Sequence, residues 1–265
     1  SNSNDGELLG FSDNGFASAQ VNNGLNFDGF GAFVAVNDSV SLNQITSEAS
    51  IAFWINLRSY GEIEDAGTYT RASSYILRKG NHLGIRIAND PGTVTRTLTV
   101  RSSDGNDGGG VAKGAWELNA PQGSLLLDEW QHFTVVYKNG MVTMYQNGIP
   151  LSEPAEGTLG TPNDLPLTIG SYDDVDTVLR FLNGSLDELS VWQRPISEEE
   201  ILDLAGKDIT GAPVIEVQPV AQKKLEGTSV TFSVVATGMR PVTYQWMHKG
   251  QTIEGATKRQ LTLNR

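Results

Sequence analysis

The chain has 265 residues, of which 38% are hydrophobic and 19% charged, so it can bury a core. It carries 31 Asp and Glu against 19 Lys and Arg, a formal net charge of −12, which argues against a protein that binds nucleic acid through clustered basic residues. The absence of cysteine excludes disulfides, thiolate metal sites and cysteine nucleophiles. No apolar run approaches the ~20 residues of a membrane-spanning helix, so we expect no membrane insertion.

The charge is divided unevenly along the chain. Residues 212–265 carry seven basic and three acidic side chains, whereas residues 1–211 carry 12 basic and 28 acidic ones. The change coincides with Thr210-Gly211-Ala212-Pro213, a short Gly/Pro joint. We therefore predict two domains, residues 1–210 and residues 211–265.

The first domain is predicted to be all-β. Short runs rich in β-branched and aromatic residues recur between turn residues. The clearest cover residues 33–36, 51–55, 75–77, 83–87, 97–100, 132–137, 142–145, 165–169 and 189–192. Nine or more short strands at this spacing are typical of a sandwich or barrel. Asn139-Gly140 supplies the two positive-φ residues of a type I′ hairpin turn.

One short helix is predicted after these strands. Ser197 can cap it and Glu200 completes a capping box, with Ile196 and Ile201 placed as a hydrophobic staple. Gly206 is placed to end the helix.

Several segments carry a family resemblance. They are 25–29 (LNFDG), 130–137 (WQHFTVVY), 144–148 (MYQNG), 167–170 (LTIG), 183–192 (NGSLDELSVW) and 196–201 (ISEEEI). In this order they resemble the opening, central hairpin and closing segment of laminin-G-like, concanavalin A-like jelly-roll domains. The resemblance spans roughly residues 8–205 and implies a jelly-roll sandwich. Lectins, glycan-binding modules, hydrolases and adhesion domains all use this fold.

The second domain alternates apolar and polar residues in runs at 229–236, 242–246 and 260–263. It resembles the first strands of a bacterial immunoglobulin-like β-sandwich, with Trp246 at the buried tryptophan of strand C and Val234 at the first disulfide position. By this resemblance strands F and G are missing, so the domain is partial, and we expect a fragment of a longer multimodular protein. The alternative is a partner strand supplied in trans.

The jelly-roll resemblance also implies a structural calcium ion. Aspartates in the matching segments commonly bind calcium together with backbone carbonyls, which assigns Asp28 and Asp187 as ligands, with carbonyls near Gly29 and Gly31. Such an ion would tie the N-terminal strand to the C-terminal one. The alternative is that both are turn aspartates that bond to their own backbone.

The sequence lacks the catalytic motifs of related enzymes. The glycosidase pattern Glu-x-Asp-x-x-Glu is absent, and the nearest acidic segment, residues 61–67, has the wrong spacing. His82, His132 and His248 are scattered, with no zinc motif and no serine-nucleophile elbow. We therefore predict a non-catalytic protein.

Loop aromatics are the candidates for stacking on sugar rings. Trp116, Tyr60, Tyr69 and Tyr172 lie outside the clear strand pattern, and Arg71 lies in one of the polar loops. Such polar side chains suit sugar hydroxyls. For Trp116 the alternative is packing under a loop.

Together these features predict a calcium-stabilised module that binds a polysaccharide or glycan and belongs to a secreted or surface-anchored bacterial protein, whose other domains are further expected partners. The rival is a protein-interaction or spacer module of a surface adhesin. A third, lower-ranked alternative is a glycoside hydrolase with carboxylates assembled from different strands. A groove with exposed aromatics favours the glycan, and a smooth face favours the spacer.

Overall fold

The structure is a computed structural model that describes residues 4–60, 73–89, 96–102, 116–172, 181–207, 212–223, 225, 228–238 and 242–264. The chain forms two compact units, Ser1–Ser197 and Glu198–Arg265. The joint predicted at residues 210–213 lies partly outside the described residues. No described helix is both long and apolar enough to cross a membrane.

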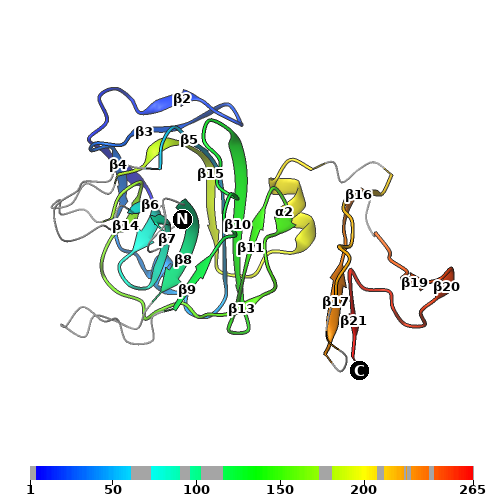
Figure 1. The fold of residues 1–265 in the computed structure, drawn as a ribbon. Helices are drawn as coiled ribbons and strands as arrows, with labels where there is room; N and C mark the ends of the chain where they lie inside the picture. The colour runs from blue at the N-terminus through cyan, green and yellow to red at the C-terminus, as the bar shows by residue number, and fades with distance from the viewer. Residues whose placement is uncertain are drawn as a thin grey trace. The chain divides into compact units, whose positions relative to one another are not determined.

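The first unit contains two antiparallel sheets (Figure 1). The seven-stranded sheet has the order β1 (Gly6–Leu9), β4 (Phe33–Val36), β14 (Leu167–Ile169), β6 (Ser73–Lys79), β7 (Leu83–Asn89), β8 (Arg96–Ser102) and β9 (Trp116–Asn119). The eight-stranded sheet has the order β12 (Ile149–Pro150), β11 (Met141–Gln146), β10 (Trp130–Lys138), β5 (Ala49–Leu57), β15 (Asn183–Trp192), β3 (Asn23–Asp28) and β2 (Phe16–Ser18), and β13 (Ala155–Glu156) pairs with β11. The nine strands predicted in this unit are confirmed.

The core is formed by the inward faces of both sheets. Phe53 of β5 and Phe133 of β10 are cross-strand partners, fully buried, with ring centroids 6.0 Å apart. On the seven-stranded sheet, Ile85 and Ile87 of β7 pair with Val100 and Leu98 of β8, and all four are fully buried. Because strand side chains alternate between faces, the residues between these apolar positions lie on the outer face of the sheet.

The predicted hairpin and helix are also confirmed. Asn139 and Gly140 have φ values of 53° and 71° and connect β10 to β11. The helix α2 (Glu198–Leu204) begins directly after Ser197 and ends before Gly206, whose φ is 66°. One further turn of helix, α1 (Val40–Asn43), is not predicted by the sequence pattern.

The second unit contains three two-stranded antiparallel sheets within its described residues. They pair β16 (Val214–Val217) with β18 (Val235–Thr237), β17 (Val230–Ser233) with β21 (Gln260–Leu263), and β19 (Met247–His248) with β20 (Gln251–Thr252). The predicted runs at 229–236 and 260–263 are strands, the first one interrupted at Val234. The run at 242–246 is not, because among the described residues only Trp246 joins it to another segment by backbone hydrogen bonds.

Candidate functional site

Polar side chains form two rows across the outer face of β6, β7, β8 and β9. In the first row Arg78 pairs with Gly84, Gly84 with Arg101, and Arg101 with Glu117. The second row runs through Tyr75, Arg86, Thr99 and Asn119. The register shifts within β6 between Tyr75 and Leu77, which brings Tyr75 and Arg78 to the same face although they are three residues apart.

Tyr172 is held at this face by Arg78 and Tyr75. The guanidinium carbon of Arg78 lies 3.9 Å from the centroid of the Tyr172 ring, a cation–π contact. Nη1 of Arg78 donates a 2.5 Å hydrogen bond to the backbone oxygen of Tyr172. Tyr75 contacts the Tyr172 ring edge-on, with centroids 5.3 Å apart. The tyrosine predicted from the sequence is therefore part of a fixed aromatic and cationic cluster.

A small slot lies beside this cluster because Gly84 has no side chain. A Cβ atom at residue 84 would lie 3.3 Å from both Cγ of Arg101 and Cε1 of Tyr75, closer than an ordinary contact. The slot has a volume of about 40 Å³. Its lining consists of Tyr75, Arg78, Gly80, Asn81, Gly84, Arg101, Ser102 and Tyr172.

Two of the arginines are coupled through one carboxylate. Nη2 of Arg86 donates to Oε1 of Glu117 at 2.6 Å, and Nη1 of Arg101 lies 3.7 Å from the same oxygen. Nε of Arg86 is buried and has no hydrogen-bond partner among the described residues. Glu117 is the one acidic residue of β6, β7, β8 and β9. On the same face as Tyr172, these strands place Arg78, Arg86 and Arg101. The described part of the site is therefore cationic.

The other predicted ligand-binding residues lie elsewhere. Trp116 is half-buried against the core, donates from Nε1 to the Thr158 oxygen at 2.7 Å, and meets the Tyr137 ring edge-on at 6.0 Å. Tyr60 also packs on the core and donates to the Leu125 oxygen at 2.9 Å. Tyr69 and Arg71 lie outside the described residues. Sugar contact by these four residues stays a prediction.

Asp28 has the contacts of a turn aspartate. Its Oδ1 accepts from the backbone N–H groups of Phe30 at 2.8 Å, Gly31 at 3.1 Å and Ala32 at 3.2 Å. Partial burial raises the pKa of Asp28, and these hydrogen bonds outweigh it, so the pKa lies below its usual value. The positive φ of Gly29, 86°, lets the chain turn between β3 and β4.

Asp187 lies at a different place on the same pair of strands. Asp28 of β3 is the cross-strand partner of Asn183. Asp187 lies beside Gly24, because a Cβ atom added to Gly24 would be 3.2 Å from the Cβ of Asp187. The four residue steps from Asn183 to Asp187 correspond to about 13 Å between their Cα atoms along a strand. Two ligands of one calcium ion lie within about 5 Å of each other. The two aspartates therefore occupy separate positions on this pair of strands, and the ion that bridges Asp28 and Asp187 stays a prediction.

The carboxylate of Asp187 instead serves the backbone. It is buried and accepts from the N–H of Val21 at 2.6 Å and of Glu188 at 2.8 Å. Glu188 has a φ of 49° at an irregularity in the β15–β5 pairing. Asp187 thereby joins the loop before β3 to this irregularity.

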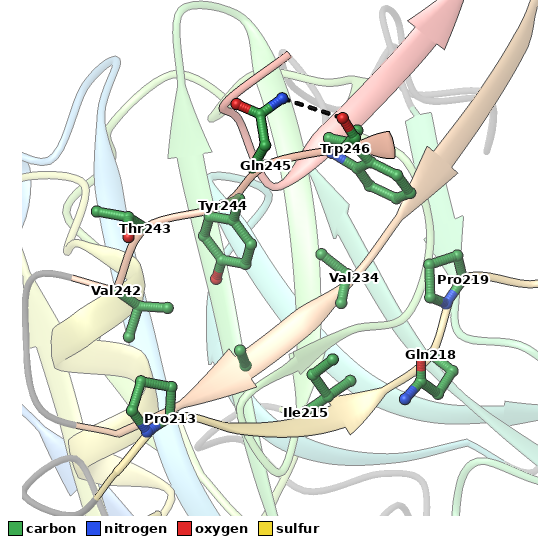
Figure 2. A pocket seen from close by; sticks show the side chains of 11 residues that line it. Pro213, Ile215, Gln218, Pro219, Val234, Val242, Thr243, Tyr244, Gln245 and Trp246 are labelled. Atoms are coloured by element: carbon green, nitrogen blue, oxygen red, sulfur yellow. Dashed lines mark hydrogen bonds between the residues drawn. The ribbon is translucent and has the colours of Figure 1, made fainter. Parts of the chain in front are cut away.

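A second hollow lies within the second unit. It has a volume of about 420 Å³ and is lined by Pro213, Ile215, Gln218, Pro219, Val234, Ala236, Val242, Thr243, Tyr244, Gln245 and Trp246. Figure 2 shows Val242 and Tyr244 across from Ile215 and Val234. The lining is mainly apolar, so this hollow suits hydrophobic side chains better than sugar hydroxyls.

One feature of the sequence indicates the polar face of β6 to β9, in addition to the positions of the strands. Gly84 and Arg86 alternate with Leu83, Ile85 and Ile87, which places them on the outer face of any strand there. The neighbours of Gly84 and Arg86 come from β6 and β8, and their identity depends on register, which the pattern does not give.

The sequence was compared with known families and proteins. The profile of Laminin_G_3, described as the concanavalin A-like lectin/glucanases superfamily, matches residues 28–202. A search of curated proteins returned no match.

Solved structures share the fold at low sequence identity. One is domain 4 of AbnA, a GH43 extracellular arabinanase from Geobacillus stearothermophilus, in complex with arabinotriose, with a TM-score of 0.50, 15% identity, and coverage of 76% of this chain and 87% of that one. A proposed carbohydrate-binding protein from Bacteroides ovatus has a TM-score of 0.50 and 18% identity over 67% of this chain and 45% of that one. The binding domain of botulinum neurotoxin serotype D has a TM-score of 0.51 and 14% identity over 82% and 51%.

Proposed function

Because the chain belongs to the concanavalin A-like lectin/glucanase superfamily, we propose that it is a non-catalytic module that binds a polysaccharide or glycan. The binding surface is the outer face of β6 to β9. The observation that carries the proposal is the fixed cluster of Tyr172, Arg78 and Tyr75 beside the slot at Gly84.

This cluster has the chemistry that a sugar requires. The C–H face of a sugar ring is apolar and stacks on aromatic rings, whereas its hydroxyls and other oxygens accept hydrogen bonds. A guanidinium group offers several donors in a fixed fork. A guanidinium group has donors and no acceptor, so Arg78 and Arg101 are suited to donate hydrogen bonds to sugar oxygens.

The comparisons support this reading at the level of the fold. One protein of similar fold was solved with arabinotriose bound and is described as part of an extracellular enzyme. We therefore propose a secreted or surface-exposed setting for the present chain, in which binding holds a larger protein on its polymer.

A second candidate function is protein interaction. The apolar hollow of the second unit, lined by Ile215, Val234, Tyr244 and Trp246 among others, favours it. This second candidate includes the proposal that the second unit is an immunoglobulin-like domain. Trp246 donates from Nε1 to the Lys258 oxygen at 2.9 Å, and its ring centroid lies 6.4 Å from that of Phe232.

We also keep a structural calcium ion as a proposal, for Asp28 with the carbonyls of Gly29 and Gly31. The hydrogen bonds to Asp28 from described residues reach Oδ1, which leaves Oδ2 for an ion. Melting the chain and its Asp28→Asn variant with and without EDTA tests it. An equal effect of EDTA on both proteins, or none on either, would remove the ion from Asp28.

A polysaccharide and glycan array probed with the folded chain tests the proposed function. We expect binding to one class of polymer, lost in Tyr172→Ala and retained in Tyr244→Ala, which alters the hollow of the second unit. Loss in Tyr244→Ala alone would move the ligand to the second unit. No binding by the folded chain would reject the carbohydrate function.

A further inference from the structure

We propose that the slot at Gly84 receives the anionic group of an acidic sugar, a carboxylate or a sulfate. This inference rests on the proposed carbohydrate-binding function and adds the class of sugar. It is drawn from the charge of the face, the donors of Arg101 in the lining of the slot and the size of the slot.

The charge of this face is opposite to the total charge of residues 1–211. Residues 1–211 carry 28 acidic and 12 basic side chains, yet three arginines project from adjacent strands here with one glutamate. Arg78 and Arg101 flank Gly84 on either side, and Arg86 is two residues along β7. A neutral sugar needs no such concentration of cations, whereas a carboxylate or sulfate pairs with guanidinium groups through charge-assisted hydrogen bonds.

Arg101 also retains donors for a ligand within the described part of the chain. Glu117 takes up Nη2 of Arg86 and lies 3.7 Å from Nη1 of Arg101, beyond hydrogen-bond distance. Arg101 lines the slot, so an acceptor oxygen of a ligand placed there can take up its guanidinium donors.

The size of the slot selects a group rather than a ring. Its volume of about 40 Å³ is a few times the roughly 10–15 Å³ that a cavity needs to hold one water molecule. A whole pyranose does not fit, but one small oxygen-bearing substituent does. The sugar ring would then lie outside the slot, next to the Tyr172 ring that Arg78 holds in place.

Binding to matched polymers tests the inference. The folded full chain is titrated in 150 mM NaCl with polygalacturonate and with its fully methyl-esterified form, which has the same backbone without the charge. Polysialic acid, dextran sulfate, neutral dextran and arabinan extend the series. Because the chain has a net charge of −12, non-specific attraction to polyanions is disfavoured, so binding to them reports a local site.

Variants separate charge from shape. Arg101→Gln removes one cation of the slot, and Gly84→Ala fills part of it without changing any charge. Arg194→Gln is the control. It also removes one arginine, but Arg194 follows the C-terminal end of β15 and does not belong to β6, β7, β8 or β9. We expect both slot variants to lose at least about tenfold in affinity for the acidic polymer and the control to keep it. Circular dichroism and melting curves establish that each variant is folded.

The outcomes discriminate between the two proposals. Binding of a carboxylated polymer over its ester supports the inference, and binding of dextran sulfate alone supports it with sulfate as the group. Equal binding of charged and neutral polymers, or equal losses in Arg194→Gln and Arg101→Gln, overturns the acidic-sugar inference and leaves carbohydrate binding in place. If the folded chain binds none of these polymers or those of the array, both proposals fail.

Discussion

Nε of Arg58 donates a 3.1 Å hydrogen bond to Oδ1 of Asn183, the residue of β15 that pairs with Asp28. The same guanidinium donates to Oδ1 of Asn26 at 2.5 Å and to the backbone oxygen of Phe27. An arginine side chain thus ties β3 to β15, the role that the sequence assigned to a calcium ion shared by two aspartates.

Arg58→Met is therefore expected to lower the melting temperature whether or not EDTA is present. The variant keeps most of the apolar stem but loses three hydrogen bonds at an exposed site, a cost of about 1–2 kcal/mol. Thermal melts of both proteins with and without EDTA measure it. A variant that melts like the parent protein would show that the strands are joined without Arg58.

Asp187→Ala is expected to be more harmful, because the N–H groups of Val21 and Glu188 then lose their buried acceptor. We expect a loss of about 1–3 kcal/mol in the free energy of unfolding from urea titration. Asp187→Asn keeps an acceptor oxygen and should recover part of it. Equal stability of the parent protein and Asp187→Ala would contradict this role.

His132 predicts a pH dependence of stability. Burial lowers its pKa from 6.5 to about 4, and its ring lies edge-on to Trp54 at 5.1 Å. Between these values the unfolded chain binds a proton that the folded chain does not, so stability falls as the pH drops from 6.5 to 4, by about 3 kcal/mol for this group. Urea titrations from pH 7 to pH 4.5 measure the slope. His132→Phe should reduce the slope and leave the part that comes from buried His82, whose pKa burial also lowers, whereas the exposed His248→Phe should leave it unchanged. Identical slopes in the two variants would exclude His132 as a cause.

Trp116→Phe separates the two interpretations of this tryptophan. From its contacts with Thr158 and Tyr137 we expect a loss of stability of about 1–2 kcal/mol and unchanged glycan affinity. Melting curves and the glycan titration are run on the same preparation. Weaker glycan binding at unchanged stability would instead support the direct sugar contact predicted from the sequence.

The fold could be predicted because its signals are local. The alternation of Leu83, Ile85 and Ile87 indicates a strand, and the φ values of Asn139 and Gly140 follow from residue types that tolerate them. These patterns require no knowledge of which strands are neighbours.

The candidate site could be predicted only in part, because it depends on register. Tyr172 was identified as a loop aromatic, but its partners Arg78 and Tyr75 share a face through a register shift within β6. The same limit applies to the predicted calcium bridge. Asp28 and Asp187 do lie on adjacent strands, and only the pairing of Asp28 with Asn183 reveals that they are far apart along them.

The position of β15 has a consequence for synthesis on the ribosome. This strand is the last of the first unit in sequence, yet it lies between β5 and β3 in the middle of its sheet. Until residue 192 has left the exit tunnel, β5 and β3 each present an edge that has no partner strand. Nascent chains that stop before this point should therefore be sensitive to protease and prone to associate, and resistance should be gained in one step once β15 is available.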